Sequence, residues 1–126
     1  MFAARILIAE DESIVARDIK TRLIRLGYPQ PIICFTGEDA VDQARLAKPD
    51  LVLMDIILSR GMMDGIEAAQ QIQSFMNVPI IYLTASNDEA TLTRAKATKP
   101  AGFILKPFET PELRDTIAAV LTKHNL

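Results

Sequence analysis

The chain has 126 residues, and its 14 Lys and Arg against 16 Asp and Glu give a formal net charge of −2. Hydrophobic residues make up 49% and charged residues 24%, which fits one globular domain and excludes an intrinsically disordered chain. No basic excess is available to neutralise phosphates, so we expect no direct contact with nucleic acid. No apolar run reaches the roughly 20 residues that cross a bilayer, and the single cysteine cannot form an internal disulfide. We therefore expect a cytoplasmic protein without membrane contact.

Five short apolar runs, rich in β-branched residues, recur at the spacing of βα units. Most of them are continuously apolar, which is typical of parallel strands that helices cover on both faces. The predicted strands are residues 4–9, 31–35, 51–54, 78–83 and 101–105.

Helical patterns fill the gaps between the strands. Apolar residues at helical spacing predict a first helix that ends before Gly27, a residue suited to the position after a helix. Three more helices are expected after Thr36, Asp64 and Thr110, each as N-cap, with Pro111 in the first position of the last helix.

One helix is weaker than the others. Segment 87–98 has Leu92 as its only large apolar residue, so we expect this helix to be the most loosely held. The chain then alternates strand and helix five times. Right-handed crossovers place the helices on both faces of one parallel sheet, which predicts an α/β fold.

Polar residues stand at the ends of four predicted strands. Glu10 and Asp11 follow the first strand, Asp55 the third, Thr84 ends or follows the fourth, and Lys106 follows the fifth. Ligands of open α/β sheets bind at the edge formed by the carboxyl ends of the strands. The sequence therefore predicts one site that collects these five side chains.

Three carboxylates in one site repel each other unless a cation compensates their charge. A site with only a few oxygen ligands from the protein suits Mg²⁺, which keeps several water molecules when it is bound. The three acids contribute −3, Lys106 adds +1 and a divalent cation adds +2, so the loaded site is neutral. Such a site can accept a phosphoryl group, with a carboxylate as nucleophile and Thr84 as a hydrogen-bond donor.

Five stretches of the sequence occur in an order and spacing that resemble a known family. They are ILIAEDES, PDLVLMDI, MDGIEAA, PIIYLTA and GFILKPF. With them the chain resembles the receiver domain of two-component response regulators, from about residue 5 to residue 124. The resemblance implies one receiver domain over residues 1–126 with a flavodoxin-like (βα)5 fold and strand order 2-1-3-4-5.

The resemblance also implies the roles of the acidic residues. Asp55 would be the phospho-acceptor. Asp11, Asp55 and the backbone carbonyl of Ile57 would ligate Mg²⁺, or alternatively Mn²⁺, and Glu10 would act through a metal-bound water.

Further roles follow from the same resemblance. Thr84, the backbone N–H of Ala85 and Lys106 would bind the phosphoryl group. Thr84 and Phe103 would form the switch, and Pro107 would follow a cis peptide bond.

By the same resemblance, the phosphoryl group would come from the phosphohistidine of a histidine kinase or of a phosphotransfer protein. The domain would be a switch and not a metabolic enzyme, with self-catalysed phosphorylation and dephosphorylation only. The face formed by the fourth helix, fifth strand and fifth helix would change and control a downstream protein or a fused output domain. A homodimer formed on phosphorylation is a further option.

Some positions depart from the pattern of the family. The loop 57–63 is two residues longer than usual and lacks the proline commonly found a few residues after the acceptor. Glu10 stands where Asp is commoner, and Phe103 where Tyr is commoner, so a switch at Phe103 acts by packing alone.

Three alternatives use similar residues or the same fold. A haloacid dehalogenase-type phosphohydrolase expects a second acid two residues after its nucleophile, where this chain has Ile57. A non-phosphorylated interaction module would have lost an acid, the threonine or the lysine, and all are present. A flavin- or dinucleotide-binding domain expects a glycine-rich first loop, where this chain has EDES.

Overall fold

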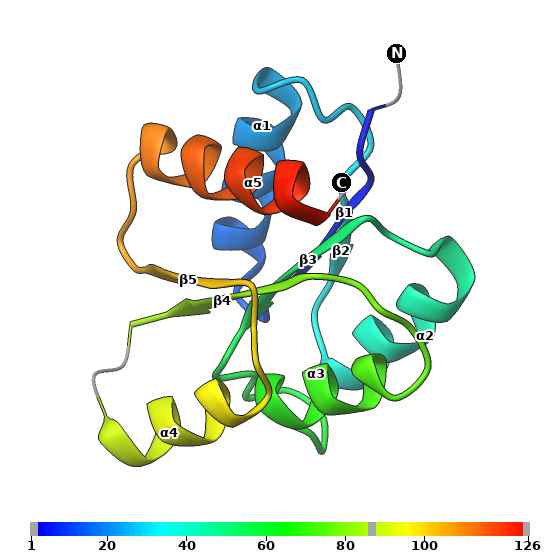
Figure 1. Ribbon diagram of the computed structural model, residues 1–126, viewed down its shortest axis with the longest axis vertical. Helices are drawn as coiled ribbons and strands as arrows, with labels where there is room; N and C mark the ends of the chain where they lie inside the picture. Colours follow the sequence, from blue (N-terminus) through cyan, green and yellow to red (C-terminus); the bar gives the residue numbers. More distant parts are fainter. Residues whose placement is uncertain (1–2, 86–87, 125–126) are drawn as a thin grey trace.

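The computed structural model describes residues 3–85 and 88–124, and within them five strands alternate with five helices (Figure 1). The strands are β1 (Ile6–Ala9), β2 (Ile32–Cys34), β3 (Leu51–Asp55), β4 (Ile80–Thr84) and β5 (Gly102–Leu105). The helices are α1 (Ser13–Arg25), α2 (Gly37–Ala47), α3 (Gly65–Gln73), α4 (Glu89–Ala97) and α5 (Thr110–His124). All strand pairs are parallel and the order is β2-β1-β3-β4-β5, which confirms the predicted flavodoxin-like α/β fold.

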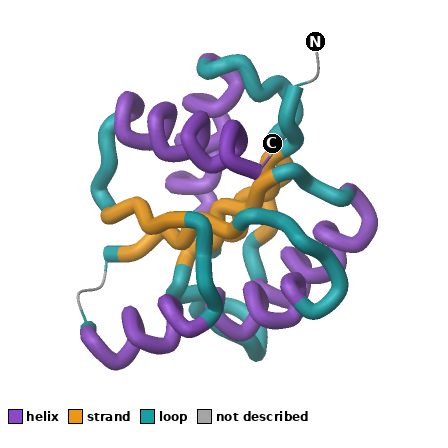
Figure 2. Tube along the Cα trace, viewed as in Figure 1, coloured by secondary structure: helices purple, strands orange, loops and turns teal. Residues whose placement is uncertain are grey.

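Helices cover both faces of the sheet, with α1 and α5 on one side and α2, α3 and α4 on the other (Figure 2). Successive residues of a strand face opposite layers. In β1, Ile6 and Ile8 pack in the cluster that contains core residues of α1 and α5, whereas Leu7 and Ala9 pack in the cluster of α2 and α3. The continuous apolar character of the central strands follows from these two cores.

The helix ends are mostly where the sequence predicts them. After α1, Gly27 has a φ of 104°, and the N–H of Tyr28 reaches back 2.9 Å to the carbonyl of Leu23, as in a Schellman motif. Thr36 and Asp64 are the N-caps of α2 and α3, because the side chain of each accepts a bond from the third helical N–H.

The start of α5 differs from the prediction by one residue. Thr110 is not a cap but the first residue of the helix. The N–H of Leu113 donates to the carbonyl of Glu109 at 3.2 Å, so Glu109 precedes the helix and Pro111 lies one position further in than predicted. Proline is tolerated there because N–H groups throughout the first turn have no partner within the helix.

Helix α4 is packed as weakly as its composition indicates. It places Ala95 in the core and leaves Leu92 half-buried, whereas α3 buries five of its residues. Asn87, the first residue of the predicted helical segment, lies outside the described residues.

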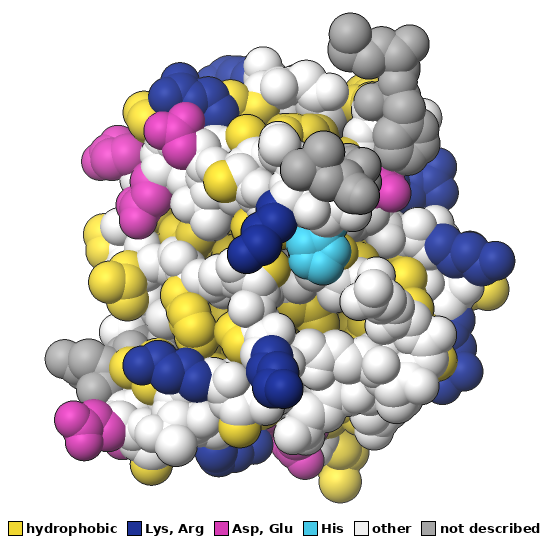
Figure 3. Space-filling model, in the orientation of Figure 1, with side chains coloured by type: hydrophobic (Ala, Val, Ile, Leu, Met, Phe, Trp, Pro, Cys, Tyr) yellow, Lys and Arg dark blue, Asp and Glu magenta, His cyan; other side chains and the backbone are white. Residues whose placement is uncertain are grey.

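Charged side chains are interspersed with apolar and uncharged ones on the face drawn in Figure 3, and the described basic residues there do not merge into one patch. This agrees with the nearly balanced charge of the sequence. Among the described residues, no helix has both the length and the apolar character that a membrane crossing requires.

Candidate functional site

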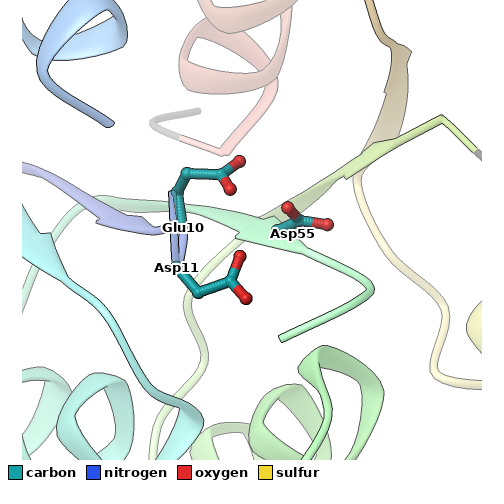
Figure 4. Close-up of side chains that lie close together, drawn as sticks. All are labelled: Glu10, Asp11 and Asp55. Atoms are coloured by element: carbon teal, nitrogen blue, oxygen red, sulfur yellow. The ribbon is translucent and has the colours of Figure 1, made fainter. Parts of the chain in front are cut away.

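Three carboxylates meet at the carboxyl ends of neighbouring strands β1 and β3. Asp55 is the last residue of β3, and Glu10 and Asp11 directly follow β1, whose Ala9 pairs with Met54. Oxygen atoms of the three acids all lie within 4.8 Å of one another (Figure 4). The acids are buried, with exposed fractions of 0% for Glu10, 9% for Asp11 and 6% for Asp55. The structure therefore brings together the three acids that the sequence predicts.

The ammonium group of Lys106 connects two of these acids. Its Nζ atom lies 2.6 Å from Oε2 of Glu10 and 2.7 Å from Oδ2 of Asp55. Lys106 follows β5, and its backbone N–H donates to the carbonyl of Thr84 at 2.8 Å, which continues the ladder between β4 and β5. The lysine side chain therefore extends past the end of β4 to reach the ends of β1 and β3.

Burial dominates the ionisation of Glu10. It raises the pKa of Glu10 well above its ordinary value; Lys106 opposes this rise and the carboxylate of Asp55 reinforces it. For Lys106, burial favours the neutral form, but the bonds to Asp55 and Glu10 outweigh it and raise the pKa of the ammonium group. Lys106 is therefore charged at neutral pH and compensates part of the acidic cluster.

Asp11 has a different partner, Ser59 in the loop between β3 and α3. Both the backbone N–H of Ser59, at 2.9 Å, and its hydroxyl donate to Oδ2 of Asp11. Burial acts to raise the pKa of Asp11, but hydrogen bonds, those from Ser59 first among them, outweigh it and hold this pKa below its ordinary value. The sequence analysis missed Ser59. Its only signal there is a hydroxyl residue shortly after Asp55.

Hydrogen bonds hold the loop of residues 56–64, which connects β3 and α3 and contains the segment 57–63 singled out in the sequence. The N–H of Ile56 donates to the carbonyl of Leu83 at 3.1 Å, and the N–H of Met62 donates to Oε2 of Glu38 in α2 at 2.8 Å. The N–H of Ile57 donates to Oδ1 of Asp55 at 3.0 Å, while the Ile57 side chain is 60% exposed. Glu38, which accepts the bond from Met62 in this loop, is a second residue that the sequence analysis missed.

Of the remaining predicted residues, Thr84, Ala85 and Pro107 lie at or beside the same edge, whereas Phe103 lies within β5, two residues before its end. Thr84 ends β4 and is 2% exposed, and Ala85 follows it on the surface. The ring of Phe103 is half-buried with its centroid 5.7 Å from that of Tyr82, on the face of the sheet that α2, α3 and α4 cover. The peptide bond before Pro107 is cis, the geometry that the resemblance implies.

The donor set fits a hard divalent cation. All three candidate side chains offer carboxylate oxygens, which Mg²⁺ and Mn²⁺ prefer to nitrogen or sulfur. With Lys106 charged, the cluster carries an excess of negative charge when its acids are ionised, and a divalent cation would neutralise it.

The sequence and the fold have clear relatives. The family model of the response regulator receiver domain matches residues 6–118. The transcriptional regulatory protein PdtaR of Mycobacterium tuberculosis is 36% identical over 119 residues, which cover 94% of this chain and 57% of that protein. The probable transcriptional regulator ycf27 of Guillardia theta is 33% identical over 121 residues, 96% of this chain and 46% of that protein. The chain thus spans about half the length of these curated relatives.

Solved structures give the same result. The signal receiver domain of a modulated diguanylate cyclase from Desulfovibrio desulfuricans has a TM-score of 0.90 and 35% identity, covering 97% of this chain and 96% of that one. The receiver domain of a sensor histidine kinase from Pseudomonas aeruginosa, solved with a magnesium ion coordinated in the active-site cleft, has a TM-score of 0.86 and 28% identity, covering 96% and 99%. By its sequence and by its fold, this chain belongs to the family of response regulator receiver domains.

Proposed function

We propose that this receiver domain is a phosphorylation-dependent signalling switch whose acceptor is Asp55. The observation that carries the proposal is the position of Asp55, buried at the carboxyl edge of the sheet, in contact with Lys106 and close to Glu10 and Asp11. A buried carboxylate that contacts a cationic side chain and has two further carboxylates close by, with which it can share a metal cation, is suited to nucleophilic attack on a phosphoryl group.

In the proposed transfer, a carboxylate oxygen of Asp55 forms a bond to the phosphorus of a phosphohistidine on a kinase or phosphotransfer protein. The phosphorus–nitrogen bond breaks, and its electron pair stays with the imidazole, which is the leaving group. Lys106 then exchanges its contact with Oδ2 of Asp55 for one with a phosphoryl oxygen. The hydroxyl of Thr84 and the N–H of Ala85 would donate to the other oxygens.

Asp11, Asp55 and the carbonyl of Ile57 would hold the cation directly, and Glu10 would hold it through a water molecule. When bound, Mg²⁺ or Mn²⁺ would neutralise charge on the oxygens of the transferred group. The magnesium ion coordinated in the related receiver domain of the P. aeruginosa histidine kinase supports this assignment.

Family membership supports a histidine kinase or a phosphotransfer protein as the upstream partner. Two relatives are named as transcriptional regulators and are about twice as long as the matched region, which supports a downstream protein or a fused output domain as the receiver of the signal. The face made by α4, β5 and α5 is the proposed output surface, including for a homodimer formed on phosphorylation. The domain itself would act as a switch with self-catalysed phosphorylation and dephosphorylation.

The direct test is phosphorylation by a small phosphodonor. With acetyl phosphate and Mg²⁺, the intact mass should increase by one phosphoryl group, which base and hydroxylamine remove. Asp55→Asn should remove the labelling, while the exposed control Asp42→Asn of α2 should leave it unchanged. Labelling that persists in Asp55→Asn would contradict the assignment of the acceptor.

A further inference from the structure

The carboxylate of Asp11 is oriented by a residue outside the predicted site. Two donors of Ser59, its backbone N–H at 2.9 Å and its hydroxyl, both reach Oδ2 of Asp11. Because both bonds go to one oxygen, they favour one rotation of the carboxylate. They leave Oδ1 as the oxygen that we assign to the cation.

The loop that carries Ser59 is itself held in place. On one side of Ser59, the N–H of Ile56 is bonded to the carbonyl of Leu83, and on the other side the N–H of Met62 is bonded to Glu38. The donors of Ser59 are therefore presented by a backbone segment that is fixed before and after it. Partners of this kind, which hydrogen-bond a metal-binding carboxylate, typically contribute about 10–100-fold to metal affinity.

We propose that Ser59 is a positioning residue for Asp11 that raises the affinity of the site for Mg²⁺, an inference that rests on the proposed cation site. Ser59 does not touch the cation in this arrangement. It acts through Asp11 by holding the carboxylate in its binding orientation before the cation arrives, which reduces the entropy lost on binding. A competing role, in which the hydroxyl blocks an oxygen that the cation needs, predicts the opposite change in affinity.

The test is a Mg²⁺ titration of the unphosphorylated protein, with the Kd read from amide chemical shifts. Ser59→Ala keeps the backbone bond and loses the hydroxyl, so the Kd should rise about 10-fold, the low end of the expected range. Ser59→Thr restores the hydroxyl at an exposed position and should bind nearly as well as the parent. The matched control is Ser74→Ala at the end of α3, where the hydroxyl donates to the carbonyl of Gln71 at 2.6 Å, away from the site.

Each other outcome overturns the proposal. An unchanged Kd in Ser59→Ala shows that the hydroxyl has no effect on the cation, and a lower Kd shows competition in place of positioning. If the Kd for Mg²⁺ rises equally in Ser59→Ala and Ser59→Thr, the effect comes from the loop and not from the hydroxyl. If the parent itself does not bind Mg²⁺, the cation site of the proposed function fails as well. If the parent binds Mg²⁺ and Ser59→Ala binds it with the same Kd, only the role of Ser59 is overturned.

Discussion

Lys106 and Glu10 are 96 positions apart in the sequence, yet Nζ of Lys106 lies 2.6 Å from Oε2 of Glu10. The Glu10 side chain is fully buried and that of Lys106 is 19% exposed, so water screens this pair only weakly. The same ammonium group also contacts Asp55. One lysine thus compensates two buried acids, and the stability of this edge should depend on it.

Replacing Lys106 by methionine should destabilise the domain in the absence of metal. Methionine has about the length of lysine but no charge, so it leaves Glu10 and Asp55 without their cationic partner. This loss should lower the free energy of unfolding by about 1–3 kcal/mol. Urea unfolding in the presence of a chelator measures this change. Lys20→Met, at an exposed position of α1, is the control and should stay within about 0.5 kcal/mol of the parent. Equal stability of Lys106→Met and the parent would mean that desolvation of the ion pair cancels its attraction.

Magnesium should stabilise the folded protein through the acidic cluster. A ligand that binds only the folded state raises the free energy of unfolding by about 2.7 kcal/mol at a concentration of 100 times its Kd, so the Tm should rise on addition of Mg²⁺. Asp11→Asn should abolish this rise. Without metal it should be slightly less stable than the parent at neutral pH, because the lowered pKa of Asp11 means that its hydrogen bonds favour the ionised carboxylate in the folded state. A full magnesium-dependent rise in the Tm of Asp11→Asn would place the cation elsewhere.

Gly65 is the first residue of α3 and packs against the backbone of Asp55. A Cβ atom at this position would lie 1.9 Å from the carbonyl oxygen of Asp55, so Gly65→Ala requires the backbone to move. We expect a loss of more than about 2 kcal/mol in urea unfolding and slower labelling of Asp55 by acetyl phosphate. The control Gly102→Ala places its Cβ 3.7 Å from Cγ2 of Thr116 and should be nearly neutral. Similar losses in both variants would contradict a specific role for the contact at Gly65.

The parts of the site that sequence reasoning found are those that a regular pattern places. Glu10, Asp55 and Lys106 each follow or end an apolar strand, and parallel strands bring such positions to one edge. Ser59 and Glu38 were missed because their partners depend on the path of the loop 56–64, which no periodic pattern encodes. The shift at the start of α5 has a similar cause, since a cap and a first helical residue differ by one hydrogen bond.

The buried thiol of Cys34 should resist alkylation in the folded protein. Burial, reinforced by the charge of Asp39, raises the pKa of Cys34 to about 12, so the reactive thiolate is rare at a pH near the ordinary cysteine value of about 8.5. The unfolded chain releases this proton more easily, so the contribution of Cys34 to stability decreases as the pH rises above that ordinary value. Reaction with a thiol reagent should be slow in buffer and fast in urea. Fast reaction in buffer would contradict the burial of the thiol.

The last prediction concerns how phosphorylation of Asp55 reaches the surface. Thr84, buried at the end of β4, is the neighbouring hydroxyl that we propose to bond the phosphoryl group. In β5, Phe103 pairs with Tyr82 in register and in ring contact, next to the weakly packed α4. We expect a small movement of Thr84 to alter the packing of Phe103, and we expect α4, which buries only Ala95 in the core, to shift with it.

Phosphorylation needs to bias this movement by only a few kcal/mol to change the populated state. Beryllofluoride with Mg²⁺, a mimic of the phosphoryl group, should change hydrogen exchange mainly in residues 84–108. Thr84→Ala should still accept a phosphoryl group on Asp55 but should show much smaller exchange changes in α4 and β5, because the bond that transmits the signal is absent. Phe103→Leu, which keeps an apolar side chain without the ring, should retain the bond at Thr84 and reduce the change in α4. If exchange changes only in residues 55–64, the output surface is the lengthened loop and not the α4–β5–α5 face.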